Sequence, residues 1–590
     1  MRRVIISLIF LMQSVVLIAQ ERTELQNILA FLGADSEEEL DSYEVERLEN
    51  YLSRPLQINC SSPARLISSG LMTQYQVASL KDYISRNGDV LSLSELAAVD
   101  GFDRDFVNKL APFISLLSYA KPGYASLSDS KKQHDISLKS GYKHTADEAG
   151  KWQYGNKYRM TSDRGPGLSL SLSKSYDAPA LKLVSGNLKW GFMRSDAKII
   201  LGDFNARFGQ GLAMWNSMVM NGLSSVSSFS RRASGISETW SYTGSNALSG
   251  AAVSISSGRM VISALAAVPG IKNSRTEYGF LPAVNVAWYG KKGQFSITDF
   301  AEFTGFTGGN TRIPHMKTAA DFRLCLKGID LFSEVSYDWV NSAPAFLAGS
   351  SFPVAEGLRA AALLRLYPSD YDSYMSAAPS SSSKNVNEAG IALAGEYMSE
   401  KHKVSFSFDT SAHSQSRLEV PEQSYQIKAL LSWQYMFSES FRMSMRLSER
   451  YRNYEDLHHR TDLRLDLSHT TSTYLVNARI NALKSDKYGF LSYLEGGLFI
   501  KTLTMYLRQG IFLIDDWDDR IYAYERNAPG NFSVPAYYGR GLWTAFNLTW
   551  KYARWGKLYA KASFQSYPFM EEEKKKPGKA ELKLQAEFSF

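Results

Sequence analysis

Apolar and polar residues alternate strictly over the last eleven positions of the chain. The apolar positions are Ala580, Leu582, Leu584, Ala586, Phe588 and Phe590, and the polar ones are Glu581, Lys583, Gln585, Glu587 and Ser589. Successive side chains of a β-strand point to opposite faces, so this pattern predicts a strand with one apolar and one polar face. A soluble protein can also end in such a strand, and the rest of the chain has to decide between the two settings.

The same alternation recurs from about residue 134 to the C-terminus. Clear examples are residues 168–173, 404–408, 442–447 and 463–468. Apolar residues facing lipid and polar residues facing a lumen produce this pattern in transmembrane β-barrels. A stack of soluble sheets gives the same local pattern. We interpret residues 134–590 as a large antiparallel transmembrane barrel of about 20–24 strands, an even number being expected.

The first 19 residues have the features of a secretory signal peptide. Arg2 and Arg3 form a basic start, an apolar run extends from Val4 to Ile18, and the small residue Ala19 is a candidate cleavage position. The run is shorter than the roughly 20 apolar residues of a spanning helix, and no later segment supplies one. If the exported chain enters a membrane, it must do so as a closed barrel, because lipid leaves an open sheet edge unsatisfied.

The C-terminal strand, which ends on Phe590, resembles the closing strand of outer-membrane β-barrels. Aromatic residues make up 13% of the chain, which suits the two aromatic girdles of such a barrel. The resemblance implies a location in the outer membrane, in contact with lipid and lipopolysaccharide. It also implies that both ends of the barrel face the periplasm, so the region before the barrel would be a periplasmic domain.

That preceding region, residues 20–120, is predicted to be helical and acidic. Residues 21–120 hold 16 Asp and Glu against 8 Lys and Arg, a net charge of −8, which leaves +13 on residues 121–590. The pattern consists of two units, each with an amphipathic helix, a Gly-containing turn and a second helix. Asn59 and Ser94 are predicted N-caps. Residues 121–133 are predicted to be a linker.

The two units resemble the tandem helix-hairpin-helix domain of competence DNA receptors. Residues 55–60 look like the start of that motif, and residues 95–102 look like its hairpin. In that family two glycines per turn let backbone N–H groups approach a phosphate. The candidate contact residues for a phosphate or a protein partner are Gly70, Leu71, Met72, Thr73, Asp100, Gly101, Phe102 and Asp103.

This chain departs from the DNA-binding pattern in its turns. Thr73 and Asp103 stand where the second glycines would be, and a carboxylate repels phosphate. The charge of −8 adds repulsion, whereas nucleic-acid binders show a basic footprint. Nucleic acid is therefore a disfavoured partner. The alternative is a packing module that docks onto a periplasmic protein or onto its own barrel.

Three segments stand out from the strand pattern, namely residues 201–212, residues 230–236, and residues 520–525 continuing to 534–541. With the helical region, they resemble a family of large Bacteroidetes-type outer-membrane proteins, and this resemblance implies no established activity. The stretch 207–247 is too long for a simple turn, and we expect it to fold into the lumen or over its mouth as a constriction. An ordinary outside loop is the alternative. The candidate lumen residues are Asp203, Arg207, Gln210, Arg231, Arg232, Arg520, Tyr524 and Glu525.

The two adjacent arginines of this set, Arg231 and Arg232, have two alternative interpretations. They pair with lumen carboxylates such as Asp203 or Glu525, or they face an anionic solute. The net charge of +13 on the barrel region motivates the anion, although part of that charge can face lipopolysaccharide or the periplasmic rim.

The sequence offers no catalytic, cofactor or metal site. The eight histidines are scattered without metal-ligand spacing, and no phosphate loop or nucleophile elbow occurs. Cys60 and Cys325 lie in different predicted domains and suggest no disulfide framework. We predict that the protein is not an enzyme, with an esterase on the outer wall as the alternative.

The sequence thus favours an outer-membrane barrel that acts as a channel, a translocation component or a subunit of an envelope complex. The helical region would gate the barrel or recruit a periplasmic partner. One alternative is a DNA-binding or DNA-transport protein that grips phosphates with its hairpins. Another is a structural scaffold with a plugged lumen.

Overall fold

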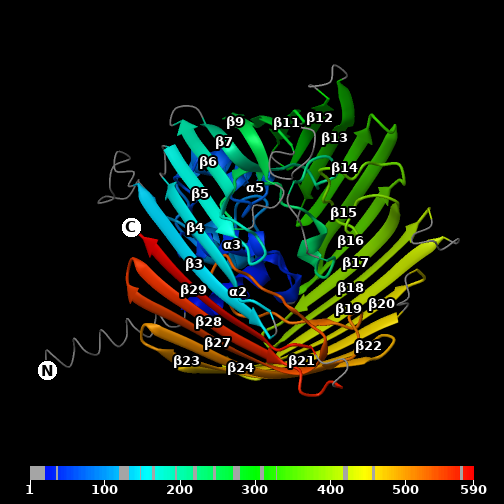
Figure 1. Cartoon of the computed structure of the whole chain (residues 1–590). Coiled ribbons are helices and arrows are strands. Elements are labelled where there is room, and N and C mark those ends of the chain that lie inside the picture. Colours follow the sequence, from blue (N-terminus) through cyan, green and yellow to red (C-terminus); the bar gives the residue numbers. More distant parts are fainter. Residues whose placement is uncertain are drawn as a thin grey trace.

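The computed structural model shows a helical region followed by a closed β-barrel (Figure 1). It describes residues 20–34, 37–118, 132–146, 148–161, 166–192, 196–216, 222–242, 247–269, 279–290, 292–305, 311–326, 328–415, 423–454, 459–571 and 576–590. The predicted signal peptide and nearly all of the predicted linker lie outside these residues.

The barrel wall consists of 24 antiparallel strands, which confirms the predicted fold class and strand number. Each strand pairs with its neighbours in sequence, and β29 closes the circle by pairing with β3 from Lys579↔Thr145 to Ser589↔Asp135. The wall strands are β3 (Gln133–Thr145), β4 (Lys151–Thr161), β5 (Pro166–Lys174), β6 (Lys182–Phe192), β7 (Asp196–Arg207), β9 (Leu248–Ser257), β10 (Met260–Ala267), β11 (Leu281–Tyr289), β12 (Gly293–Thr304), β13 (Arg312–Leu326), β14 (Ile329–Asp338), β15 (Ala343–Ala355), β16 (Leu358–Tyr367), β17 (Glu388–Met398), β18 (His402–His413), β19 (Ser424–Met436), β20 (Phe441–Arg452), β21 (His459–Thr470), β22 (Tyr474–Lys484), β23 (Tyr488–Ile500), β24 (Leu503–Ile514), β27 (Gly539–Ala553), β28 (Gly556–Ser566) and β29 (Lys579–Ser589).

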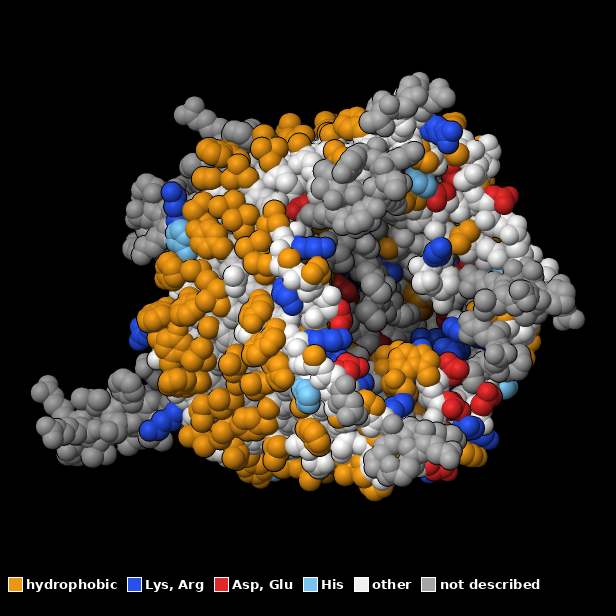
Figure 2. Space-filling model, viewed as in Figure 1, with side chains coloured by type: hydrophobic (Ala, Val, Ile, Leu, Met, Phe, Trp, Pro, Cys, Tyr) orange, Lys and Arg blue, Asp and Glu red, His pale blue; other side chains and the backbone are white. Residues whose placement is uncertain are grey.

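The alternation of residues along each strand separates the two faces of the wall. On β29, Leu582 and Leu584 are 47% and 53% exposed on the outside, whereas Gln585 is only 4% exposed. Figure 2 shows hydrophobic side chains spread over the outer wall, while charged side chains gather around the opening. An apolar outer band and a polar inner face are the pattern of a barrel embedded in lipid. Among the described helices, none is both long and apolar enough to cross a membrane.

The two ends of the barrel have connections of different length. At the end where β3 begins and β29 finishes, each pair of successive strands is joined by no more than four residues. At the opposite end, long connections occur at 208–247, 368–387 and 515–538. In outer-membrane barrels the short turns are periplasmic and the long loops face outward. We refer to these as the short-turn end and the long-loop end.

The helical region lies inside the barrel (Figure 1). Its ion pairs and contacts reach strands all round the wall, from β4 and β7 through β11 and β16 to β22. We call residues 20–118 the plug. The sequence had led us to expect a separate body in the periplasm. The plug lies inside the barrel instead. Its helices are α2 (Gln20–Leu32), η1 (Glu37–Glu39), α3 (Ser42–Ser53), α4 (Pro63–Ser68), α5 (Gln74–Asn87), α6 (Leu93–Leu96), α7 (Arg104–Leu110) and η2 (Ala111–Phe113).

The plug has an apolar core of its own. Phe31, Leu48, Leu66, Leu80 and Phe113 are among its buried members. The two-stranded parallel sheet of β1 (Leu56–Gln57) and β2 (Ile114–Ser115) ties the start of the hairpins to their end. The plug is therefore a compact unit with its own packing, placed inside a second structure.

The helix starts differ in part from the predicted ones. α4 is capped by Ser62, and α6 by Ser92, each of which accepts a hydrogen bond from a backbone N–H two or three positions into the helix. Ser94 lies inside α6, and Asn59 instead binds the backbone of Val90 through its side-chain amide, at 2.9 Å in both directions. The prediction of Asn59 as a cap was wrong because its side-chain amide satisfies a loop instead. The prediction of Ser94 was wrong by two residues, since the preceding Ser92 has the same side chain and takes the cap position.

The long connection after β7 also enters the lumen. At Gly202, with φ of 101°, β7 parts from β6, and its last residues pair with the short strand β8 (Gly235–Glu238). Phe204, Phe208 and Phe229 (in η3, Val226–Phe229) are almost completely buried. We call the described parts of residues 203–242 the lumenal loop.

Candidate functional site

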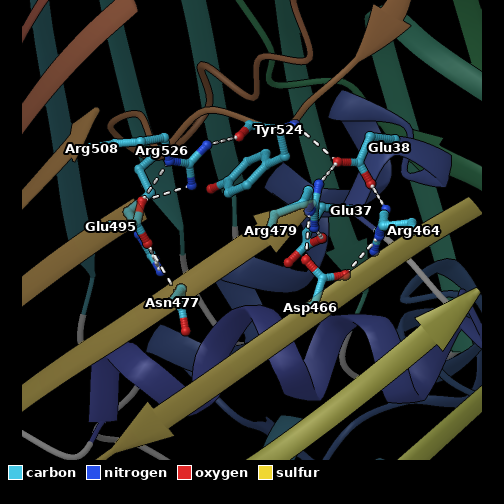
Figure 3. A network of polar contacts seen from close by, with 10 residues as sticks. All are labelled: Glu37, Glu38, Arg464, Asp466, Asn477, Arg479, Glu495, Arg508, Tyr524 and Arg526. Carbon is cyan, nitrogen blue, oxygen red and sulfur yellow. Dashed lines mark hydrogen bonds and ion pairs between the residues drawn. The ribbon is translucent and has the colours of Figure 1, made fainter. Parts of the chain in front are cut away.

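Several ion pairs between plug and wall meet at η1, a run of three glutamates, Glu37–Glu39. Figure 3 shows Glu37 and Glu38 beside the wall arginines Arg464 and Arg479. Glu38 accepts from Arg464 on β21 at 2.8 Å and from Arg479 on β22 at 2.6 Å. Glu39 pairs with Arg446 on β20. Three successive strands therefore point one arginine each at one acidic turn of the plug.

The strand register explains why this part of the wall attracts an anion. Arg446 and Arg464 are direct cross-strand partners, and like charges placed directly opposite destabilise a sheet. On the other side, Arg479 is opposite Asp466, which binds both Arg464 and Arg479 at 2.7 and 2.6 Å. One wall carboxylate therefore serves two of the three arginines, and η1 of the plug supplies the remaining negative charge.

The electrostatics of Glu38 follow from this arrangement. Burial alone would raise the pKa of Glu38, but Arg479 and Arg464 outweigh it and hold the pKa well below its usual value. The backbone N–H of Tyr524 also donates to Glu38, at 3.1 Å. Glu38 thus stays ionised in the docked plug, and its charge-assisted bonds are of the stronger kind.

Further ion pairs join the plug to the wall around its circumference. Glu44 binds Arg207 at 2.6 Å, with the arginine side chain only 3% exposed. Glu46 pairs with Lys157, and Arg54 pairs with Asp135. At the short-turn end, Asp103 binds Arg359 at 2.6 Å. Apolar contact between plug and wall gathers at Val261, Ala287 and Tyr289, which join the core of the plug.

The lumenal loop, in contrast, is anchored to the wall by apolar packing. Phe204 and Phe208 share a buried cluster with inward-facing wall residues such as Phe300 on β12. Leu212 and Phe229 share another with wall residues such as Leu347 on β15. The strands behind the loop are thus apolar on both faces near the long-loop end, which makes the loop a fixed part of the barrel interior.

Three of the predicted lumen residues lie at the start of the lumenal loop. Asp203 accepts from the Gly186 N–H at 2.7 Å and from the Ser249 hydroxyl at 2.5 Å, which holds the bend after Gly202. The backbone N–H of Gln210 donates to the carboxylate of Glu334 at 2.6 Å. Arg207 binds Glu44 of the plug, as described above.

The adjacent arginines contact other groups than the predicted carboxylates. The backbone N–H of Arg231 donates to the side-chain oxygen of Gln210 at 2.8 Å. Arg232 donates to the Phe31 carbonyl at 3.3 Å and lies over the Phe31 ring. Burial lowers the pKa of each arginine to about 10. The proposed pairing with Asp203 or Glu525 is replaced by contacts to the loop itself and to the plug.

The last three candidates belong to the connection 515–538, which forms a small hairpin of β25 (Ile521–Tyr522) and β26 (Ala536–Tyr537). Arg520 lies at its outer edge, over the ring of Trp517. Tyr524 touches Glu38, and Glu525 binds Lys561 on β28 at 2.6 Å. The hairpin thus links the long-loop end to η1 of the plug.

The hairpin turns of the plug differ in exposure. Gly70, Leu71, Met72 and Thr73 are all buried, and the Thr73 side chain caps α5. In the second turn Phe102 is buried, Gly101 is partly buried, and Asp100 and Asp103 are exposed. The Asp103 side chain caps α7 and binds Arg359. The first turn, as docked, offers no accessible backbone for a phosphate.

Six residues of the η1 contact were not among the candidates predicted from the sequence, namely Glu37, Glu38, Glu39, Arg446, Arg464 and Arg479. A run of three glutamates looks like a solvated turn, and the arginines look like ordinary lumen-facing residues. The one available signal was the opposite charge of the two regions. Among the described residues, no cluster of His, Cys, Asp and Glu could hold a metal ion.

No family model and no curated protein matches the chain. The fold is similar to solved barrels, among them the E. coli P pilus tip assembly intermediate PapC-PapD-PapK-PapG, with 10% identity, a TM-score of 0.47, and coverage of 80% of this chain and 64% of that chain. It is also similar to the siderophore receptor PirA from Pseudomonas aeruginosa, with 7% identity, a TM-score of 0.41, and coverage of 78% and 81%. A third is the FrpB iron transporter from Neisseria meningitidis, with 10% identity, a TM-score of 0.37, and coverage of 78% and 82%. Such values carry no information on what this chain binds or transports.

Proposed function

We propose that the protein is an outer-membrane channel or translocation component whose acidic helical plug is the gate. The apolar outer band and the short turns at one end support a barrel in lipid, with the short-turn end toward the periplasm. The observation that carries the proposal is the contrast in anchoring. The lumenal loop is held by apolar clusters, whereas η1 and α3 of the plug are held to the wall by ion pairs.

Ion pairs suit a gate because both partners can be hydrated when they separate. Glu38, Arg464 and Arg479 lose a bonded partner on release of the plug, but water replaces it in an opened lumen. An exposed apolar face of the lumenal loop would have no such substitute. The plug, which has its own core, can therefore leave its docked position as a unit at a moderate cost.

The structure changes the argument for an anionic solute. Much of the lumen's positive charge faces the carboxylates of the plug, at Arg446, Arg464 and Arg479 and at Arg207 and Lys157. The opposite charges of the two regions are thus complementary surfaces of one interface. Only when the plug leaves does this charge face a passing solute.

A crosslink at the short-turn mouth tests the gate. In a background in which Cys60 and Cys325 are changed to Ser, Asp103→Cys and Arg359→Cys would be joined by a short bis-maleimide. We expect channel openings at high salt in planar bilayers before the crosslink forms, because salt weakens the ion pairs, and none afterwards. A control pair of cysteines within the plug should leave the openings unchanged.

Equal openings in the locked and unlocked protein would refute the gate. A complete lack of openings in both would instead favour the second candidate, a plugged scaffold of the envelope. That candidate is supported by the hairpin 515–538, which starts at the long-loop end and donates backbone hydrogen bonds to Glu38 and Glu49 of the plug.

A further inference from the structure

A chamber lies between the plug and the wall. It has a volume of about 230 Å³ and lies between α2 and α3 of the plug, strands β27, β28, β29, β3 and β4, and the tip of the hairpin 515–538. Ligand sites usually measure roughly 300–1,000 Å³. The chamber is smaller than this range, so it suits only a small solute and excludes a polymer or a folded protein.

The charge of the chamber is strongly uneven. Its basic lining residues are Arg54, Lys139, Lys157, Arg159, Arg526, Lys557, Lys561 and Lys583, and its acidic ones are Glu46, Glu49, Asp135 and Glu587. Several of these basic groups are paired, Arg54 and Arg159 with Asp135, for example. Arg526, Lys561 and Lys583 pair with Glu495, Glu525 and Glu581 next to the lining. The positive charge that faces the chamber therefore lies on the other basic residues, Lys139 among them, in a partly buried space where charges are screened less than at the surface.

Two aromatic rings hold the central cations in place. The Lys139 ammonium lies 3.7 Å from the centre of the Tyr242 ring, and Lys157 lies 4.0 Å from the same ring. Arg159 lies 4.0 Å from the centre of the Trp240 ring. An aromatic face stabilises a cation without cancelling its charge. The rings therefore position these side chains and leave their positive potential in the chamber.

Lys139 is the cation best placed to receive an anion. Its ammonium donates to the side-chain oxygen of Asn531 at 3.0 Å, which is a neutral partner. Directly across from it in the sheet is Gly155, where an added Cβ would come within 2.5 Å of the Lys139 side chain. The missing side chain at this position makes the room that Lys139 occupies.

The plug places its own carboxylate beside this cation. Glu46 pairs with Lys157, whose side chain is only 2% exposed. A carboxylate is a model of an oxyanion ligand, so the chamber already shows how it holds one. We propose that the chamber binds a small solute carrying a phosphate or carboxylate group, which is held by Lys139 and Lys157 in competition with Glu46.

The proposal deepens the proposed gate, because an anion that takes Lys157 from Glu46 weakens one of the links that hold the plug. Binding itself does not depend on the gate. The two can therefore fail separately: a solute can bind to a plug that never leaves, and a plug can leave without binding a solute.

Isothermal titration of the full-length protein in detergent tests the proposal at constant ionic strength. The probes are inorganic phosphate, glucose 6-phosphate and citrate, with glucose as the neutral control. We expect saturable binding of at least one oxyanion and none of glucose. Lys139→Gln should weaken that binding roughly tenfold, the loss expected for one hydrogen bond to a charged group. Glu46→Gln should strengthen it, since the competing carboxylate is gone.

The matched control is Lys198→Gln. Lys198 is also a buried, lumen-facing lysine, but it donates to the Ile236 carbonyl at 2.7 Å and lies outside the chamber. Binding should stay within twofold of the wild-type value. Absence of oxyanion binding to the folded wild-type protein would overturn the proposal, as would equal losses in Lys139→Gln and Lys198→Gln. If Lys139→Gln does not fold, the wild-type and Glu46→Gln titrations still decide the question.

Discussion

The substitution Glu38→Gln removes the plug carboxylate that binds two wall arginines and keeps the side chain's shape. Glu38 accepts three hydrogen bonds, from Arg464, Arg479 and the Tyr524 N–H, and its side chain is 12% exposed. Breaking a buried ion pair by removing one partner costs about 3–5 kcal/mol. Because Asp466 still binds both arginines, we take the lower end of this range.

A cost of about 3 kcal/mol corresponds to a change of about a hundredfold in the ratio of docked to released plug. Trypsin cleavage within the plug measures this ratio, because cleavage tracks the open population when opening and closing are fast. We expect the cleavage rate of the native protein to rise by about two orders of magnitude. The barrel should remain intact, as judged by its heat-modifiable gel mobility.

Asp82→Asn is the control for that substitution. Asp82 is on α5, half exposed, and it pairs with Arg86 four residues further along the helix. Such surface pairs contribute roughly 0.2–1 kcal/mol, so cleavage should rise less than about fivefold. If Glu38→Gln and Asp82→Asn gave the same cleavage rate, the plug would not be held by its deep ion pairs, and the reasoning would fail.

Two further predictions concern the bend of β7 and the pH dependence of docking. Gly202→Ala places a Cβ 2.2 Å from the Gly186 carbonyl oxygen, at a residue whose φ is 101°. We therefore expect a lower midpoint of thermal unfolding. The control is Gly191→Ala, whose added Cβ meets nothing within 4 Å and should leave the midpoint unchanged. Burial and the nearby Glu44 raise the pKa of Asp41 to about 6, so the docked plug binds a proton that a released plug does not. Docking should therefore strengthen by about 1 kcal/mol as pH falls from 7 to 5, a range in which a released Glu38 is still ionised. Plug release followed by fluorescence should show this trend in the wild type and lose it in Asp41→Asn; a wild type that releases its plug more readily at pH 5 than at pH 7 would contradict the assignment.

The barrel could be predicted from the sequence because its cause is local. A wall between lipid and a polar lumen imposes the same alternation on each strand, as residues 580–590 show. The sequence limited the number of strands to about 20–24, and the wall has 24. What fills the lumen depends instead on contacts between residues hundreds of positions apart, such as Glu38 with Arg464, and no local pattern records them.

The helical region shows the same limit in another form. Its two hairpins and its acidic charge were visible in the sequence, and docking onto its own barrel was one of the open alternatives. The choice among periplasm, partner and lumen required the strand register. Arg446 and Arg464 become a site for an anion only because they are cross-strand partners, and that pairing is a property of the closed sheet.

The division of charge between plug and wall also has a consequence for assembly. A lumen lined by Arg446, Arg464, Arg479 and Lys157 repels itself until an acidic body enters it, so a barrel that closed without its plug would gain stability by binding one. An apolar interface would give the same attraction but would also promote aggregation of the exposed plug before docking. Charge complementarity avoids that cost, because both surfaces remain soluble while apart. The same property would let a docked plug separate from the wall again, which is why we regard the ion-paired interface as a gate rather than as a fixed core.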